Sequence, residues 1–189
     1  MSKPGADERD VVQAVRSAGV RIESVYDLLK IDEYKAALPV LVNFLNEVSD
    51  PRTKEGIVRA LTTKGARGIA GKALVREFKR ETDPLLKWTI ANALSEVIED
   101  GIFDDVVALA RDERHGKARE MLASALGNSK RREAVPVLAE LLKDEVTVGH
   151  AVKALGKLRA KECRSNLEAL TRHDKAWVRN AAKSALSKL

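Results

Sequence analysis

Two short sequence features recur together along most of this chain, and their common period constrains the fold more than any other property. Aspartate ends an apolar segment at spacings of 33, 29, 32 and 30 residues, at Asp50, Asp83, Asp112, Asp144 and Asp174. An Ala-Leu pair follows each aspartate, at Ala60-Leu61, Ala93-Leu94, Ala125-Leu126, Ala154-Leu155 and Ala185-Leu186. Two independent features with one period indicate about five internal repeats.

The chemistry of the aspartate turn predicts a helix after it. In Asp50-Pro51 and Asp83-Pro84 the carboxylate can cap free amide groups of a starting helix, and proline at the first helical position loses no hydrogen bond. Apolar residues then recur at steps of three and four up to each Ala-Leu pair, which is one buried stripe per helix. With only five prolines and 4% aromatic residues, the composition also favours helix over strand.

A second helix precedes each turn. The segments 37–41 and 134–138 read Ala-Leu-Pro-Val-Leu and Ala-Val-Pro-Val-Leu, with proline near the expected helix start, where it is tolerated. Each repeat is therefore predicted as a first helix, a tight turn and a second helix. One such pair cannot bury its apolar faces alone, so neighbouring repeats must stack.

These repeats resemble HEAT repeats, particularly the short bacterial variety also found in phycobilisome lyases. The segments 133–144 and 174–186 carry the resemblance best, and it covers about residues 34–189. It implies an all-α fold, a curved α-solenoid that usually scaffolds or binds proteins, with a few enzymatic or nucleic-acid-binding exceptions. Because fold alone does not fix function, the role of this chain stays a hypothesis by analogy.

The predicted organisation has three parts. Residues 1–7 are expected to be a disordered N-terminus. Residues 8–33 fall outside the period and form two amphipathic stretches, which predicts a helical cap over the first repeat. The repeat array then occupies 34–189, with repeats at about 34–66, 67–100, 101–130, 131–160 and 161–189.

The period also predicts which residues face a partner. Positions six and two before the Leu of each Ala-Leu pair lie opposite the buried stripe and would line the inner, concave face of a solenoid. On this strip the candidate partner-binding residues are Glu55, Arg59, Trp88, Asn92, Glu120, Ser124 and Lys153. Trp88 is a natural centre of binding energy, since Trp joins a large apolar area to an indole donor. The alternative is that Trp88 fills a gap against the neighbouring helix.

Two further patterns are expected to serve the fold. Position seven before the same Leu is basic in four repeats, at Lys54, Lys87, Arg119 and Arg179, and is Val148 in the fourth. These side chains are predicted to form a ladder of ion pairs with the turn aspartates. Trp177, at the beginning of the last helix, is predicted to pack in the core under the turn, and the alternative is that it is exposed at an uncapped end.

Charge suggests an alternative function. Residues 129–189 hold 14 basic and 7 acidic side chains, whereas residues 1–128 hold 20 and 21. A basic end can meet nucleic acid or an acidic protein, and it can equally be a solvated surface. The residues that nucleic-acid binding would use are Lys130, Arg131, Arg132, Lys153, Lys157, Arg179 and Lys183. Two features argue against nucleic-acid binding: Trp177 is the only residue there on which a base could stack, and acidic residues are interspersed among the basic ones.

No pattern predicts catalysis, a cofactor or a metal site. The histidines His115, His150 and His173 lie in different repeats without ligand spacing, and the lone Cys163 can form neither an intrachain disulfide nor a thiolate zinc site. The glycines around Gly68 lack the Walker pattern, and the acids around Asp104 suit a helix start. A DNA glycosylase of HEAT type would need a carboxylate where Asn92 stands, and a bilin-protein lyase or chaperone rests on analogy alone.

We expect a non-enzymatic protein-interaction scaffold in the cytoplasm, with no membrane partner, as a monomer or weak homo-oligomer.

Overall fold

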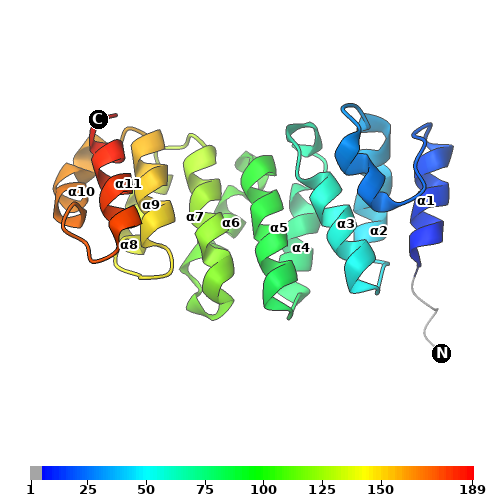
Figure 1. Ribbon diagram of the computed structural model, residues 1–189, viewed down its shortest axis with the longest axis horizontal. Coiled ribbons are helices and arrows are strands. Elements are labelled where there is room, and N and C mark those ends of the chain that lie inside the picture. The colour runs from blue at the N-terminus through cyan, green and yellow to red at the C-terminus, as the bar shows by residue number, and fades with distance from the viewer. Residues whose placement is uncertain (1–5) are drawn as a thin grey trace. The chain divides into compact units, whose positions relative to one another are not determined.

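The computed structural model describes residues 6–189, and these residues are almost entirely helical (Figure 1). Within them the only β-type pairing is an isolated bridge between Ala6 and Val48. The first helices of the repeats are α2 (Leu38–Leu45), α4 (Gly71–Arg80), α6 (Phe103–Arg111), α8 (Ala134–Leu141) and α10 (Arg164–Leu170). The second helices are α3 (Pro51–Leu61), α5 (Pro84–Val97), α7 (Arg119–Asn128), α9 (Val148–Lys157) and α11 (Ala176–Leu186). The predicted all-α helical-repeat fold is confirmed.

The chain folds as two compact units, one ending at Gly101 and the other spanning Ile102–Leu189. In the first unit, α2 packs on α3 and α4 packs on α5. In the second unit, α6 packs on α7, α8 on α9 and α10 on α11. Within each unit the second helices also pack on one another, α3 on α5 and α7 on α9 on α11, as Figure 1 shows. Within each unit, neighbouring repeats therefore bury apolar faces against each other.

The turn aspartates act as predicted in the two Asp-Pro turns. The Asp50 carboxylate accepts a hydrogen bond from the Thr53 amide at 2.7 Å, and the Asp83 carboxylate accepts one from the Leu86 amide at 2.8 Å. Asp112 instead caps the short 3-10 helix η5 (Glu113–Ala118), and α11 begins without a side-chain cap. The side-chain cap at the start of the second helix therefore differs between repeats.

The segment before the first repeat covers it with two short elements. In α1 (Glu8–Ser17) the apolar face of Val11, Val12 and Val15 is buried, and α1 packs on α2. The 3-10 helix η1 (Val25–Lys30) packs on α3. Of the N-terminus predicted as disordered, residues 1–5 lie outside the described residues, while Asp7 caps α1 with its side chain.

The basic residues seven before each Leu bind the turns mainly through carbonyl groups. Lys87 donates to the carbonyl of Glu81 at 2.9 Å, and Arg179 donates to the carbonyls of His173 and Asp174 in the turn after α10. Arg119 donates to the Ala110 carbonyl at 2.7 Å and is the one member that pairs with a turn aspartate, Asp144. Lys54 pairs with the buried Glu77 carboxylate at 2.6 Å. The predicted ladder of ion pairs with turn aspartates is therefore wrong for Lys54, Lys87 and Arg179, because a charge pattern does not reveal the competing glutamate or the free carbonyls near a helix end.

The Ala-Leu step marks where second helices touch. The five alanines of these pairs are buried, and so are their leucines except Leu186. In the second unit, a Cβ built on Gly127 would lie 2.8 Å from the Cα of Ala154, and one built on Gly156 would lie 2.8 Å from the Cα of Ala185. In the last two repeats the alanine of the pair therefore packs directly on a glycine of the preceding second helix, which brings the two backbones together.

In the described part of the chain, no helix has both the length and the apolar character that a membrane crossing requires.

Enlarging Gly156 should destabilise the second unit. The Gly156→Val side chain would overlap the backbone of Ala185, so we expect a loss of about 2 kcal/mol, larger than the small gain in helix propensity. Urea unfolding followed by circular dichroism measures it. Ser165→Val, at an exposed position of α10, is the control and should leave the unfolding midpoint nearly unchanged. Equal midpoints for both variants would contradict the close packing.

Candidate ligand groove between α9 and α11

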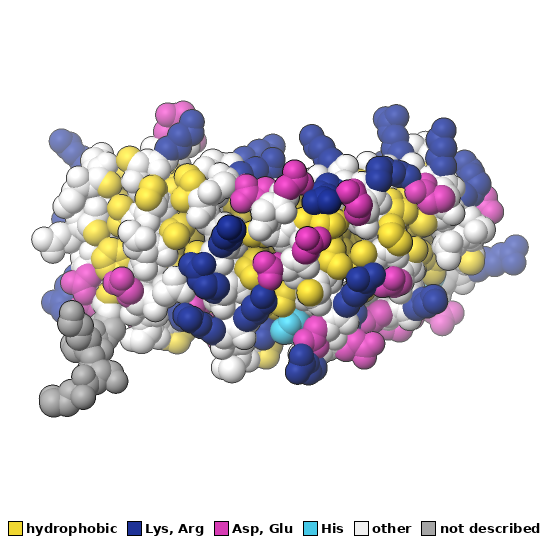
Figure 2. All heavy atoms as spheres, turned by 180° about the vertical axis from the view of Figure 1, so that it is seen from behind, with side chains coloured by type: hydrophobic (Ala, Val, Ile, Leu, Met, Phe, Trp, Pro, Cys, Tyr) yellow, Lys and Arg dark blue, Asp and Glu magenta, His cyan; other side chains and the backbone are white. Residues whose placement is uncertain are grey.

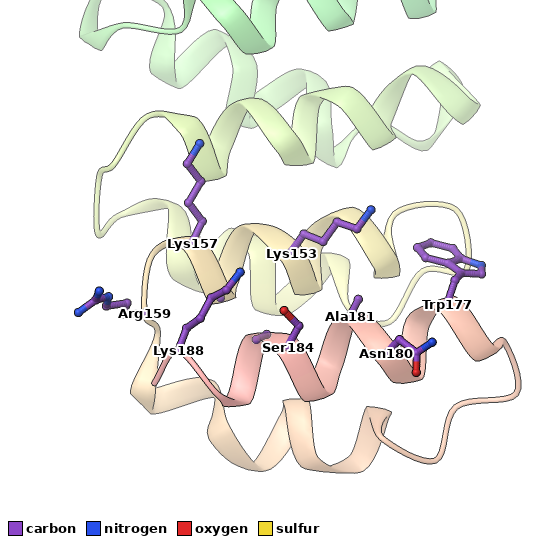
Figure 3. A pocket seen from close by; sticks show the side chains of 10 residues that line it. Lys153, Lys157, Arg159, Trp177, Asn180, Ala181, Ser184 and Lys188 are labelled. Atoms are coloured by element: carbon purple, nitrogen blue, oxygen red, sulfur yellow. The ribbon is translucent and has the colours of Figure 1, made fainter.

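The second unit carries a groove of about 920 Å³ between α9 and α11 (Figure 3). The loop after α9 completes one end of it. The residues that line the groove are Lys153, Gly156, Lys157, Arg159, Trp177, Asn180, Ala181, Ser184, Ala185 and Lys188. Four of these side chains are cationic, one is aromatic and none is acidic, so the groove combines positive charge with one large apolar surface.

The floor of the groove follows from the close packing of the two helices. Because Gly156 lies directly on Ala185, no long side chain fills the space between α9 and α11. Asn180 and Ser184 are exposed on the α11 side. Their short side chains leave polar groups accessible along the floor.

One end of the groove is cationic. Lys157, Arg159 and Lys188 lie at this end, near the carboxyl ends of α9 and α11, and the Arg159 side chain is directed outward from the other two (Figure 3). Lys157 donates a hydrogen bond to Asn128 Oδ1 of α7 at 2.6 Å, which holds its amine in place. Positive charge is favourable at a helix carboxyl end, where the helix dipole places partial negative charge.

Arg159 occupies a backbone conformation that glycine usually takes. Its φ is 50°, and it follows α9 as the residue that ends the helix in the left-handed region. Lys130 stands at the equivalent position after α7 with a φ of 61°. Both positions thus carry a basic residue at a backbone cost of about 1 kcal/mol relative to glycine.

Trp177 forms the other end of the groove. It is 45% exposed, so the prediction that it packs in the core is wrong. Its indole covers Gly149 of α9, where a Cβ would come within 1.7 Å of the ring, and the Lys153 ammonium lies 5.9 Å from the ring centroid. Because Gly149 has no side chain, the Trp177 ring can lie on the surface of α9 at this position.

His150 adds a titratable group beside Trp177. Its ring meets the indole edge-on, with centroids 6.4 Å apart, and its Nδ1 is buried without a hydrogen-bond partner. Burial lowers the pKa of His150, and Lys153 lowers it further, while the charge of Glu120 acts in the opposite direction. The imidazole is therefore held neutral near this end of the groove.

Only part of the predicted strip lies in this groove. Lys153 lines it, while Ser124 donates a hydrogen bond to the Glu120 carbonyl at 3.2 Å on α7. In the first unit, Trp88 and Asn92 are half-buried on α5. The sequence left open whether Trp88 is exposed or packed, and in the structure its side chain is half-buried.

The remaining strip residues of the first unit pair with each other on α3. Arg59 donates to the Glu55 carboxylate at 2.7 Å. Glu55 also lines a smaller cavity of about 460 Å³ beside the turns that hold Asp50 and Asp83. That cavity has mixed charge, with Lys54 and Arg52 facing Glu81 and Asp83, so it lacks the one-sided character of the groove between α9 and α11.

The basic residues proposed for nucleic-acid binding divide into two groups. The arginines are engaged: Arg131 pairs with Glu133 at 3.0 Å, Arg132 pairs with Glu162, and Arg179 holds a turn. Lys153 and Lys157 line the groove, and Lys130 and Lys183 are exposed. The arginine positive charge is largely neutralised, whereas the lysine charge is available.

The face of the first helices shows no such separation of charge. Figure 2, which views the molecule from behind, shows basic and acidic side chains interspersed with apolar ones on that face of each unit. Ion pairs across neighbouring first helices, such as Arg111 with Glu140 at 2.8 Å, account for part of this pattern. Among the described residues, no group of three His, Cys, Asp or Glu side chains is placed to hold a metal ion.

Stacked pairs of antiparallel helices, with the second helices carrying the groove, define a helical repeat protein. Residues 118–144 match the family model described as the PBS lyase HEAT-like repeat. That match covers about one repeat, and over the described residues the fold is that of a helical repeat protein.

Designed proteins are among its structural neighbours. One is a designed armadillo repeat protein in complex with peptide (KR)4, at 19% identity and a TM-score of 0.59, with 96% of this chain and 94% of that chain covered. A second designed armadillo repeat protein has 17% identity, a TM-score of 0.57 and coverage of 96% and 92%. An engineered protein has 21% identity, a TM-score of 0.58 and coverage of 96% and 90%. No curated protein matches the sequence.

Trp177, Arg159 and Lys188 were not among the predicted strip residues. A signal for Trp177 was nevertheless present, because Gly149 occupies a strip position that carries a side chain in every other repeat. A glycine in a row of larger residues indicates a neighbour that needs the space. Arg159 follows the helix in the left-handed conformation, which an arginine in the sequence does not predict.

Filling the slot at Gly149 should release Trp177. In a Trp88→Phe background, Trp177 is the sole tryptophan, and Gly149→Ala should shift its emission to longer wavelength as the indole moves into water. Loss of the covered half of the ring should cost about 1 kcal/mol. Ser184→Ala, a change of similar size on α11, should leave the emission unchanged. An unshifted spectrum in Gly149→Ala would contradict the described packing of the ring.

The neutral His150 should make stability depend on pH. Because its pKa in the folded chain is lowered from the ordinary value of 6.5, its contribution is complete above that value and is lost as the pH falls towards the lowered pKa. We expect the drop in urea midpoint between about pH 8 and about pH 5.5 to be smaller in His150→Gln than in the unmodified chain. His115→Gln and His173→Gln, at the other histidines, are the comparison variants. An identical drop in the unmodified chain and in His150→Gln would contradict this assignment.

Proposed function

We propose that this chain is a non-enzymatic scaffold that binds a segment of a partner protein on the face formed by its second helices. The groove between α9 and α11 is the observation that carries the proposal. A half-exposed tryptophan and an arginine beside short polar side chains suit a protein-binding surface, where Trp and Arg are enriched among the residues that supply most of the affinity.

The fold supports an extended ligand. Each repeat presents the same strip positions, so successive second helices offer similar side-chain positions at regular intervals. A structural neighbour with the same fold is a designed protein in complex with a peptide, which supports a peptide as the kind of ligand that this architecture can hold. The strip residues Glu55, Arg59, Trp88 and Asn92 in the first unit, and Glu120, Ser124 and Lys153 in the second, stay part of the proposed surface.

The alternative function is nucleic-acid binding through the basic residues of the last third. The lysines in the groove favour it, since they offer positive charge beside an aromatic ring. The neutralised arginines and the single tryptophan favour a protein partner instead. We therefore place nucleic acid second.

We propose a cytoplasmic location and a monomer or weak homo-oligomer. Cys163 is the sole cysteine of the sequence and is buried. Burial raises the pKa of its thiol, so the group suits a reducing compartment and a structural role.

Selection from a random-peptide display library against the full chain tests the function. We expect enriched peptides whose affinity falls by about tenfold or more in Trp177→Ala, because a central tryptophan dominates such interfaces. Trp88→Ala shows whether the strip of the first unit takes part. Asn166→Ala, exposed on α10, is the control. A selection without enriched peptides, or enriched peptides that bind both tryptophan variants as tightly as the unmodified chain, would reject the proposal.

A further inference from the structure

The two ends of the groove between α9 and α11 differ in chemistry, and this difference specifies a ligand. Lys157, Arg159 and Lys188 form the cationic end, Trp177 forms the aromatic end, and Lys153 stands between them (Figure 3). We propose that the groove binds an extended acidic segment of the partner, with carboxylates at the cationic end and an apolar side chain against Trp177. This inference rests on the proposed function and assigns the chemical class of its ligand.

Charge is the first argument for an acidic ligand. No acidic side chain lines the groove, and among the described residues neither Lys153 nor Lys188 forms an ion pair. Uncompensated like charges in one depression repel one another and raise the local potential. A ligand that brings carboxylates removes that repulsion and gains charge-assisted hydrogen bonds.

Arg159 is the second argument. The left-handed conformation that ends α9 is one that glycine adopts without strain, yet the chain places arginine there. Arg159 forms no ion pair with any described residue, so its side chain adds no such contact to the fold. Lys130 has the same conformation outside the groove, so what distinguishes Arg159 is its place in the groove lining, where its guanidinium group is available to a carboxylate.

Asn180 and Ser184 argue for a peptide over a nucleic acid. They line the groove between its two ends, and both side chains can donate and accept hydrogen bonds. A peptide main chain presents donors and acceptors alternately, whereas a phosphodiester backbone presents acceptors alone. Trp177 already covers Gly149 with part of its ring, which leaves room for one apolar group and no series of stacked bases.

The dimensions agree with a short segment. The ten residues of α9 extend over about 15 Å, a distance that about five residues of extended chain can span. A designed neighbour of the same fold is in complex with a basic peptide, (KR)4. The present groove is positively charged, so it favours an acidic peptide instead.

Fluorescence anisotropy with three labelled probes tests the proposal. The probes are a ten-residue peptide of Glu and Asp with one central Leu, the same peptide with Lys in place of each acid, and a ten-nucleotide strand of deoxythymidine. We expect the acidic peptide to bind to the full chain more tightly than either other probe, and added salt to weaken it. In a Trp88→Phe background, its binding should also change the emission of Trp177.

Charge-matched variants locate the site. Lys157→Gln with Lys188→Gln should weaken acidic-peptide binding about tenfold, since each removes a surface charge contact. Lys161→Gln with Lys183→Gln removes the same charge from exposed positions outside the groove and should change binding by less than about twofold. Arg159→Gly should weaken binding without lowering the urea midpoint, because glycine relieves the backbone while it removes the cation.

Four results would overturn the proposal. Equal weakening by the two lysine pairs would mean that net charge, and not the groove, attracts the peptide. Tighter binding of the deoxythymidine strand than of the acidic peptide would favour the nucleic-acid alternative. A lower urea midpoint in Arg159→Gly would mean that the arginine serves the fold. If display selection yields binders and the acidic peptide does not bind, this inference fails while the proposed function stands.

Discussion

The contact of glycine with alanine between neighbouring second helices is the constraint on which the second unit depends. Gly127 lies on Ala154 and Gly156 lies on Ala185, each close enough that a single added carbon would meet backbone. Backbones this close leave no space for large side chains between α7, α9 and α11. Apolar volume is therefore buried on the side of the first helices, and the opposite side of the second helices carries short polar residues and long flexible cations. The floor of the groove is a direct result of how the repeats stack.

The same geometry decides the electrostatics of the surface. In three repeats a basic residue near the start of the second helix donates to carbonyl groups at or after the end of the first helix. Through these contacts Lys87 and Arg179 gain no acidic partner, whereas Arg119 also pairs with Asp144, and each contact fixes its side chain in the fold. The cations at the other end of the second helices have no such task. Lys188 and Arg159 extend beside helix carboxyl ends, where the dipole favours them and no acid competes.

Much of this fold could be predicted from the sequence, because its determinants are local. The Asp-Pro turns cap helices through atoms two or three residues away, and the apolar stripes follow from helical periodicity. The five predicted repeats each contain one pair of α-helices. The partners of the side chains were harder to predict. The basic ladder was expected to meet aspartates, yet backbone carbonyls compete for the same donors, and sequence does not show which acceptor lies nearer.

Trp177 shows most clearly where local reasoning stops. Its position at a helix start predicts burial under the turn, and a large apolar residue ordinarily gains from it. Its actual place depends on Gly149, which lies 28 residues earlier on another helix and leaves a slot of the right depth. Half of the indole is covered there while the other half meets solvent beside Lys153. A tryptophan that gains packing from its own fold and still presents apolar surface needs little reorganisation before a ligand can contact it. That is why the groove, and not the half-buried Trp88, offers the stronger case for recognition.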